Sequence, residues 1–319
     1  MKPHSVKGSG LRIDLYLFDL FPDLTRSKIQ SLIKSHKILL DNEPTKSSYI
    51  LKGDEEIQYD LKFEEDKNDK SIEPEDMNIN IIHEDSEIIV INKKSGVVVH
   101  PGAGNYTGTI LNGLIDKIDK TSFSSTPGIV HRLDKETSGV MIIAKNFKAH
   151  AFLSKQFEKR EVNKIYRALV WGACDDSGVI EGYIVRNEKN RKSFILSKSD
   201  RGRHSKTKYK LIEKLGPISY LELKPHTGRT HQIRVHMKSI GHPILSDDTY
   251  SGGSKMIKSF HVKYTKLLKN VLKCIDRVAL HAESIEFIHP LTDKKVSFKA
   301  ECPDDFNEAI KIIRNNEPV

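Results

Sequence analysis

The sequence predicts an α+β protein in which a large sheet domain follows a smaller unit. Two observations support this prediction. From about residue 78 onwards, short β-branched and apolar runs interleave with runs of helical periodicity, and no internal repeat is present. Before that point, residues 61–77 are rich in Asp and Glu and almost free of apolar side chains, so they cannot bury enough surface to offset chain entropy. We therefore expect a flexible tail (1–10), a small domain (11–60), an acidic linker (61–77) and a large domain (78–319).

The composition narrows the class of protein. The formal net charge of the 319-residue chain is +9, which suits a polyanionic partner because Lys and Arg displace counterions from phosphates. The three cysteines, Cys174, Cys274 and Cys302, form no CxxC pair and indicate a reducing compartment. The amino terminus lacks the apolar core of a signal peptide, and no apolar run has the length that spans a bilayer. These features predict a cytoplasmic protein without a membrane segment.

The small unit has a recognisable order of elements. Its first segment, LRIDLYLFDLF, fits helix and strand templates equally, whereas Ile29, Leu32 and Ile33 mark one face of a second, helical segment. A strand at 38–40, a turn at 41–42 and an extended run at 56–59 follow. This order resembles the S4 RNA-binding fold, in which the basic second helix faces RNA phosphates. The resemblance implies RNA contact by a set of basic residues that could otherwise form a solvated face: Arg26, Lys28 and Lys34.

The segment TPGIVHRLDKETSGVMIIAK, residues 126–145, holds the best candidate for a reactive group. Polar residues stand here between two apolar strands, where the framework can fix a carboxylate, and Asp134 is that carboxylate. The alternative is an Asp that caps its own turn. A kinase catalytic loop is excluded because no Asp-Phe-Gly follows. A metal site is not predicted either, because the additional ligands His231 and His236 are spaced poorly for one helix face.

Two more residues belong to this group of candidates. In the run LELKPHTGRTHQIRVHMKSIGHPIL, Arg234 lies near the start of a predicted helix, where it can form a bidentate pair with a carboxylate. In KIYRALVWG, strand alternation places Tyr166 on the same face as Ala168 and Val170. Taken singly, Arg234 could be a surface residue and Tyr166 a core aromatic.

These segments occur in the order seen in the RluA/RluD-type pseudouridine synthases. GIVHRLDKETSGVMIIAK, KIYRALVWG, LKPHTGRTHQIRVHMKSIGHPIL and ALHAESIEFIHP carry the resemblance, and NKKSGVVVHPGAGN matches the family's upstream loop. With the S4-like unit, the chain looks most like the RluD branch, whose members act on large-subunit (23S) ribosomal RNA. The resemblance implies a largely antiparallel sheet in the large domain, isomerisation of uridine to pseudouridine in structured RNA, no cofactor and a monomer.

The resemblance also implies roles for single residues. Asp134 is the catalytic carboxylate, Tyr166 packs on the base and helps to remove the C5 proton, and Arg234 pairs with Asp134. Arg132 enters the RNA stack in place of the everted uridine. The segment 186–210 is rich in Lys and Arg and predicts phosphate contact beside the site. The remaining residues to which we assign RNA contact are His131, Arg229, Arg191 and Lys192.

A few positions depart from the family pattern. Lys94 stands where the family usually has Pro, Ser246 precedes Asp247 where Gly is usual, and Val278 follows Arg277 where Gln is usual. Two alternatives therefore remain: a non-catalytic RNA-binding or ribosome-assembly factor, and a synthase of the same family that acts on transfer RNA. The uridines modified and the chemical route taken by Asp134 are left open.

Overall fold

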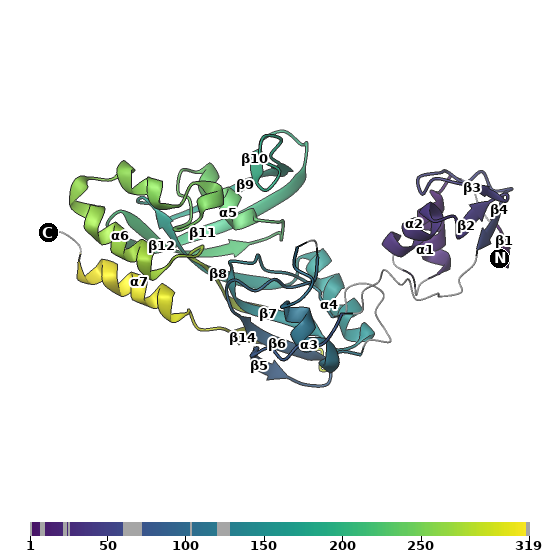
Figure 1. Cartoon of the computed structure of the whole chain (residues 1–319), viewed down its shortest axis with the longest axis horizontal. Coiled ribbons are helices and arrows are strands. Elements are labelled where there is room, and N and C mark those ends of the chain that lie inside the picture. The colour runs from purple at the N-terminus through teal and green to yellow at the C-terminus, as the bar shows by residue number, and fades with distance from the viewer. Residues whose placement is uncertain are drawn as a thin grey trace. The chain divides into compact units, whose positions relative to one another are not determined.

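The computed structural model describes residues 2–6, 10–21, 24, 26–59, 72–102, 104–119 and 128–316, with side chains except at residues 2, 19 and 26–28. These residues form two compact units, one before and one after a boundary at residues 72 and 73 (Figure 1). Most of the predicted acidic linker, residues 61–71, lies outside the described part of the chain.

The first unit is a small antiparallel sheet with two helices. The sheet has the order β1-β4-β2-β3, and the buried side chains of both helices share one core with it. The helical segment is confirmed, with Ile29 and Ile33 buried, and the ambiguous first segment is also helical. Its elements are β1 (Lys2–Ser5), α1 (Ile13–Leu20), α2 (Arg26–Lys34), β2 (Ile38–Leu40), β3 (Glu43–Pro44) and β4 (Glu56–Tyr59).

The tail predicted at residues 1–10 contains a strand, so that prediction was wrong for its first part. Residues Lys2–Ser5 pair along the whole of β4, and Val6 is buried beside them. The short segment KPHS has no apolar periodicity. Its order comes from backbone hydrogen bonds to a partner strand more than fifty residues later, which a local pattern cannot reveal.

The second unit is built on one ten-stranded sheet. Its order is β10-β9-β11-β12-β8-β13-β7-β6-β5, with β14 paired to β13. Every pair is antiparallel except β13 with β7, which confirms the mixed, largely antiparallel sheet. The strands are β5 (Asn80–Glu84), β6 (Ile88–Lys93), β7 (Ser138–Ala144), β8 (Asn163–Trp171), β9 (Ser177–Arg186), β10 (Phe194–Ser197), β11 (Arg203–Leu215), β12 (Ile218–Pro225), β13 (Leu280–Ile288) and β14 (Lys295–Lys299).

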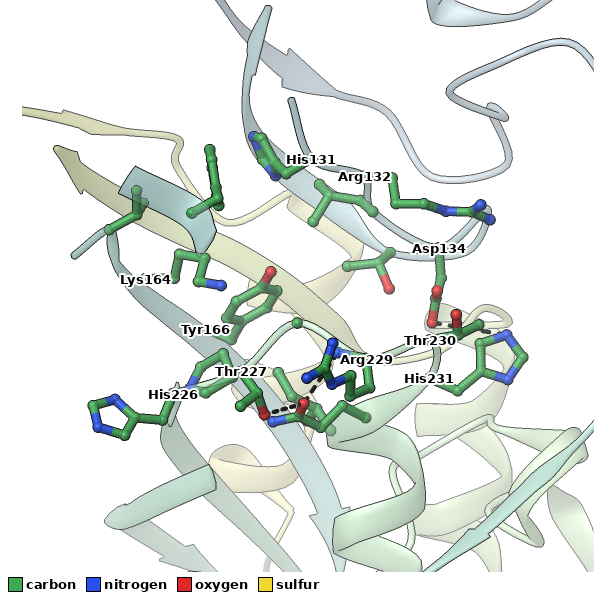
Figure 2. A pocket seen from close by; sticks show the side chains of 18 of the residues that line it. His131, Arg132, Asp134, Lys164, Tyr166, His226, Thr227, Arg229, Thr230 and His231 are labelled. Carbon is green, nitrogen blue, oxygen red and sulfur yellow. Dashed lines mark hydrogen bonds and ion pairs between the residues drawn. The ribbon is translucent and has the colours of Figure 1, made fainter. Parts of the chain in front are cut away.

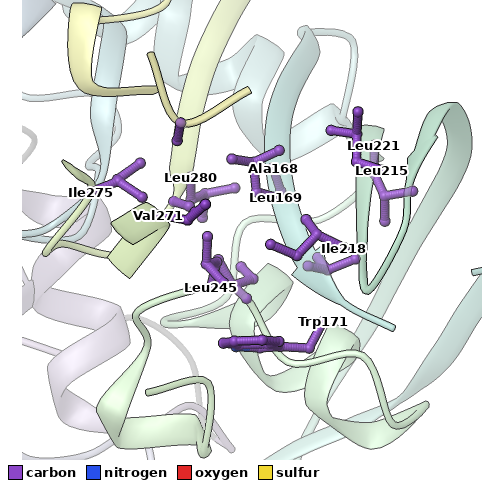
Figure 3. Packing of buried hydrophobic residues seen from close by; sticks show 14 of the residues in the cluster. Ala168, Leu169, Trp171, Leu215, Ile218, Leu221, Leu245, Val271, Ile275 and Leu280 are labelled. Atoms are coloured by element: carbon purple, nitrogen blue, oxygen red, sulfur yellow. The ribbon is translucent and has the colours of Figure 1, made fainter. Parts of the chain in front are cut away.

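Helices pack against strands in both halves of this sheet (Figure 1). Helix α4 contacts β7 and β13, whereas α5 contacts strands β9 to β12, and α7 packs on α6 and β11. The main core lies between β8, β12 and these C-terminal helices; Trp171, Leu245 and Val271 lie in it (Figure 3). The helices are α3 (Ile110–Leu114), α4 (Phe147–Lys159), α5 (Gln232–Ser239), α6 (Thr265–Cys274) and α7 (Asp304–Asn315), with short 3₁₀ turns at Ile115–Lys117, Asp248–Tyr250, Ser254–Ser259 and Val262–Tyr264.

The large domain begins earlier than the predicted residue 78. The amide of Asn112 donates to the carbonyl oxygen of Glu73, and the backbone N–H of Glu75 donates to the carbonyl oxygen of Asn112. These bonds fix an acidic segment on α3, although it buries little apolar surface of its own. The boundary therefore lies at Glu73, within the stretch that composition alone assigned to a linker.

The parallel pairing of β7 with β13 depends on one glycine. Gly139 has φ +118°, and a Cβ added there would lie 2.2 Å from the carbonyl oxygen and 2.6 Å from the N of Ala282. Strand β7 begins one residue earlier, directly after the loop that holds Asp134. The close approach of the two backbones thus sets where that loop ends.

We expect Gly139→Ala to lower the free energy of unfolding by more than about 4 kcal/mol. The added methyl group would clash with the backbone of Ala282, which cannot move away as a flexible side chain could. Gly241→Ala is the matched control, since Gly241 also has positive φ but open space around it. It should cost only about 1–2 kcal/mol. Urea denaturation measures the free energy of unfolding of both variants. Equal losses of stability in the two variants would contradict the steric argument.

Candidate active site

The second unit contains a pocket of about 480 Å³, a usual size for a small-ligand site. Four segments supply most of its lining: the loop before β7, the end of α4 with the residue after it, strand β8, and the segment that runs from the end of β12 into α5. Asp134 faces it from the loop before β7 and Tyr166 from β8 (Figure 2), and Arg234 lines it from α5. The fold thus brings together the three residues predicted to be catalytic.

A buried lysine holds the loop that carries Asp134. Lys93, at the end of β6, is 1% exposed, and its Nζ donates to the carbonyl oxygens of Lys94 (2.9 Å), Val97 (2.8 Å) and Lys135 (3.1 Å). Burial lowers the pKa of Lys93 to about 8, and the nearby Asp134 carboxylate opposes that shift. The ammonium therefore ties two loops together by charge-assisted hydrogen bonds.

The same two loops are joined by further hydrogen bonds. The Ser95 hydroxyl donates to the carbonyl oxygen of Glu136 (2.7 Å), and the Gly96 N–H donates to that of Lys135 (2.9 Å). The residues that follow Asp134 are thereby fixed from outside the loop. The carboxylate can then keep one position without substrate, which is what preorganised catalysis requires.

Arg234 makes its strongest contact with an aspartate that we did not assign to the site. Its Nε and Nη2 lie 2.7 and 2.8 Å from the two carboxylate oxygens of Asp247, whereas its Nη1 lies 3.4 Å from Asp134 Oδ2. Burial would lower the pKa of Arg234, but the bonds to Asp247 and the charges of Asp247 and Asp134 raise it. Arg234 does contact Asp134, but its principal partner is Asp247.

Asp247 is fully buried and also accepts from the backbone N–H of Tyr250. One feature of the sequence could have indicated that Asp247 belongs to the site. A buried Arg must be paired with a carboxylate, and Asp247 is an acid that follows the exit of the helix bearing Arg234. We noted Asp247 only as part of a departure from the family pattern, because nothing local shows that the two side chains meet.

A histidine and a second tyrosine extend this network. His231, at the start of α5 with φ 56°, has Nδ1 2.8 Å from the Tyr250 hydroxyl, which accepts the Phe194 N–H at 3.0 Å. The other ring nitrogen of His231, Nε2, lies 4.0 Å from Asp134 Oδ2. Burial lowers the pKa of His231 and Asp134 opposes that shift. Through Tyr250, the site is thus linked to the start of strand β10.

Tyr166 forms one wall of the pocket. Burial first, and then the negative charge of Asp134, raise the pKa of Tyr166 well above its ordinary value of 10. The phenol is therefore neutral near pH 7. A neutral phenol can pack on a base or donate a hydrogen bond, but it is a poor proton acceptor.

The side chain of His131 holds the loop to the sheet. Its Nε2 accepts the Ile142 N–H at 3.0 Å, and its ring stacks on Phe157 with centroids 4.8 Å apart. Burial, followed by the charge of Lys164, lowers the pKa of His131 to about 3, so the ring is neutral. The contact with RNA that we assigned to His131 stays a prediction.

Two predicted RNA-contact arginines lie at the pocket. Arg132 is exposed, and Arg229 donates through Nε to the carbonyl oxygen of His204 at 3.2 Å. Burial lowers the pKa of Arg229, and the positive charges of Arg203 and Arg160 add to that shift. Such a group of cations favours binding of an anion, so both contacts remain predictions with physical support.

The other predicted RNA-contact residues are not among those that line the pocket. Arg191 and Lys192 are exposed in the turn between β9 and β10. In the first unit, Lys34 is exposed at the end of α2. Arg26 and Lys28 belong to the same helix, but their side chains lie outside the described residues.

Two further properties concern cofactors and membranes. Within the described residues, no group of three or more His, Cys, Asp or Glu is arranged to hold a metal ion. None of the helices in this part of the chain has both the length and the apolar character to cross a bilayer.

Comparison with known proteins identifies the family. The RNA pseudouridylate synthase pattern matches residues 87–239, which include Asp134, Tyr166 and Arg234, and the S4 domain pattern matches residues 11–57. A protein of Chlorobaculum parvum named an uncharacterized RNA pseudouridine synthase is 41% identical over 95% of this chain and 94% of its own length. The chain belongs to the RNA pseudouridine synthases.

Other similar proteins are also named pseudouridine synthases. The ribosomal large subunit pseudouridine synthase D of Xanthomonas campestris is 37% identical over 97% of this chain and 90% of its own. Among solved structures, human RNA pseudouridylate synthase domain containing 4 aligns with a TM-score of 0.58 at 26% identity, covering 74% of this chain and 93% of that one. Family and fold predicted from the motifs are confirmed.

The structure explains how Ser246 is accommodated where the family usually has Gly. Ser246 adopts φ 62°, a conformation that favours the Gly usual in the family, at a cost of roughly 1–2 kcal/mol. Its hydroxyl donates to the carbonyl oxygen of Ile275 at 2.6 Å, which offsets part of that cost. The substitution therefore leaves the neighbouring Asp247 in place.

We expect Asp247→Asn to lower the rate of uridine isomerisation at least about 100-fold, because Arg234 loses the partner that orients it. The free energy of unfolding should also fall by about 3–5 kcal/mol, since a buried charge is left unpaired.

The control is Asp305→Asn, which breaks the bidentate Arg277–Asp305 pair outside this pocket. It should lower stability while the isomerisation rate stays near that of the wild type. Both variants are assayed at a temperature where they remain folded. If Asp247→Asn is destabilised but fully active, Asp247 has no positioning role.

Proposed function

We propose that this enzyme isomerises uridine to pseudouridine in large-subunit ribosomal RNA, with Asp134 as the catalytic carboxylate. The observation that carries the proposal is the position of the Asp134 carboxylate in the pocket, beside Tyr166 and within 3.4 Å of the buried Arg234. The ribosomal target rests on relatives named ribosomal large subunit pseudouridine synthase D, which align over nearly the whole chain.

The reaction rearranges atoms without adding any. The bond between ribose C1′ and uracil N1 breaks, and N1 keeps the electron pair. The base then turns, C1′ bonds to C5, a proton leaves C5 and one arrives at N1. No electrons are gained or lost, so the chemistry requires a positioned carboxylate, proton transfer and exclusion of water rather than a redox cofactor.

Asp134 is placed for the bond-breaking half of this reaction. Three routes are open to a carboxylate here: attack at C1′, addition to C6, and removal of the C2′ proton. In each route the carboxylate loses or gains negative charge, and the guanidinium of Arg234 is a fixed cation beside it. Because Asp247 holds that guanidinium, it need not move during the reaction.

Tyr166 then serves as the surface on which the base lies. Its raised pKa means that it does not act as a phenolate near neutral pH. We therefore assign removal of the C5 proton to Asp134, the pocket carboxylate next to Tyr166, rather than to Tyr166 itself. Tyr166 contributes packing and a hydroxyl donor.

A uridine must leave its RNA stack to enter this pocket, at a cost of a few kcal/mol that is lowest for loop nucleotides. The exposed Arg132 stands at the rim, and its planar cation suits stacking on the neighbouring bases. The S4 unit and the exposed Arg191 and Lys192 supply contacts to phosphates. We further propose that the enzyme acts as a monomer in the cytoplasm.

The two alternatives differ from this proposal in testable ways. A non-catalytic RNA-binding factor has no use for a buried Arg–Asp pair aimed at a second carboxylate, so the site favours an enzyme. A transfer RNA target would change the substrate but not the chemistry. Each alternative is addressed by one experiment.

Asp134→Asn should lower the isomerisation rate by at least about 10⁴-fold, as removal of other catalytic groups does. The dissociation constant for RNA should stay within about threefold of the wild type. Asp176→Asn, at a carboxylate that is 90% exposed, is the matched control and should be fully active. An Asp134→Asn rate close to that of the wild type would contradict the proposed role of the carboxylate.

Pseudouridine mapping addresses the substrate. In cells whose only copy of this enzyme is Asp134→Asn, we expect pseudouridines to disappear from large-subunit ribosomal RNA and to persist in transfer RNA. The full-length inactive protein keeps any role in assembly, so a loss reflects catalysis alone. Unchanged ribosomal sites together with the loss of a transfer RNA site would overturn the ribosomal assignment.

A further inference from the structure

Lys164 is a cation in the pocket to which no role has been assigned. It lies two residues before Tyr166 on β8, so both side chains face the same side of the strand, and both line the pocket. Figure 2 shows its amine directed toward the space over Tyr166. A Cβ on Gly228, in the opposite wall, would lie 3.8 Å from Lys164 Nζ.

The ammonium of Lys164 has no hydrogen-bond acceptor or ion-pair partner among the residues that the structure describes. Its nearest aromatic neighbour is Phe157, whose ring centroid lies 5.8 Å from Nζ. Burial lowers the pKa of Lys164 to about 8. A partly desolvated donor without an acceptor is costly, and it is retained where a ligand supplies the acceptor.

The groups that face Lys164 do not supply this acceptor. His131 is neutral and already accepts a backbone N–H, and Tyr166 is a neutral phenol. From α4, the exposed Glu158 and Arg160 line the same pocket, and from the segment before α5 so do His226 and Arg229. Glu158 is the only carboxylate of that set, and it makes no ion pair with Lys164 in the described structure.

The place of Lys164 relative to Asp134 indicates what the missing acceptor is. Figure 2 shows Lys164 on one side of Tyr166 and Asp134 on the other. A uracil that lies on Tyr166 with N1 and ribose toward Asp134 turns its opposite edge, C4 with its carbonyl oxygen, toward Lys164.

We propose that Lys164 is a further catalytic residue, whose ammonium donates a hydrogen bond to the C4 carbonyl oxygen of the everted uracil. The inference rests on the proposed function. When the C1′–N1 bond breaks, the electron pair left on N1 is delocalised through C6, C5 and C4 onto that oxygen. A fixed cationic donor in a dry pocket stabilises the negative charge there.

The same contact selects uracil over cytosine. An ammonium can only donate, and cytosine carries an amino group, itself a donor, at C4. Two donors that face each other leave both unpaired, which costs more than a missing contact. Phosphates are met more readily by the exposed arginines at the rim, Arg132 and Arg160, than by a half-buried lysine on the pocket wall.

The test uses full-length enzyme in excess over a large-subunit ribosomal RNA transcript that carries tritium at uracil C5, because tritium leaves when C5 bonds to C1′. Lys164→Met should lower the maximal single-turnover rate about 100- to 1,000-fold, the usual effect of removing one preorganised donor. Its RNA dissociation constant should stay within about threefold. Lys295→Met, at an exposed lysine of the edge strand β14, should match the wild type.

A second variant, Lys164→Arg, keeps the donor and raises its pKa. The wild-type rate should fall as the pH rises through about 8, where the Lys164 ammonium loses its proton. Lys93, whose pKa is also about 8, titrates in both enzymes, so the Lys164→Arg rate should fall less steeply over the same range. Equal pH profiles would overturn the inference. The inference would also be overturned if Lys164→Met kept the wild-type maximal rate but bound RNA more weakly, with the slope of log binding constant against log salt concentration reduced by about one. That result would identify Lys164 as a phosphate contact instead.

These outcomes separate the inference from the proposed function. If the wild-type enzyme releases no tritium from the transcript while it binds the RNA, the proposed ribosomal function fails. If the wild type is active and Lys164→Met is equally active, only the role of Lys164 fails. Because Lys164 has no partner to lose within the described structure, Lys164→Met should unfold at or above the wild-type denaturation temperature, which checks that it folds.

Discussion

The active site depends on the buried pair of Arg234 and Asp247. A guanidinium with 7% of its side chain exposed is tolerated in the core only because both oxygens of a fully buried carboxylate bind it. That pairing uses Nε and Nη2, so the remaining nitrogen, Nη1, is directed at Asp134. The geometry of one ion pair thereby decides the electrostatic surroundings of the reacting carboxylate.

The rest of the site is held by the sheet rather than by the pocket itself. Lys93 at the end of β6 fixes the residues after Asp134, and His131 fixes the residues before it to β7. Gly139 then lets β7 approach β13 closely enough to pair in parallel. A loop restrained at both ends by a rigid framework can present its carboxylate in one orientation, which favours catalysis over binding alone.

The pocket has more donors than acceptors. Arg132, Arg229 and Lys164 bring positive charge to it, and Asp134 is the carboxylate that we propose acts on the substrate. This imbalance is typical of a site whose ligand supplies the acceptors: phosphates at the rim and carbonyl oxygens within. The net charge of the whole chain, +9, is positive like that of the pocket. Long-range attraction and local chemistry therefore both favour RNA.

The sequence alone predicted the fold class and the family, and the resemblance of its motifs to that family named Asp134, Tyr166 and Arg234 as the candidate catalytic residues. The tertiary structure decided the rest. It paired Asp247 with Arg234, ordered β1 by hydrogen bonds to β4, and bound the ring of His131 to the backbone of β7. These outcomes depend on contacts between residues far apart along the chain or on the burial of polar groups, and neither leaves a local signature in the sequence.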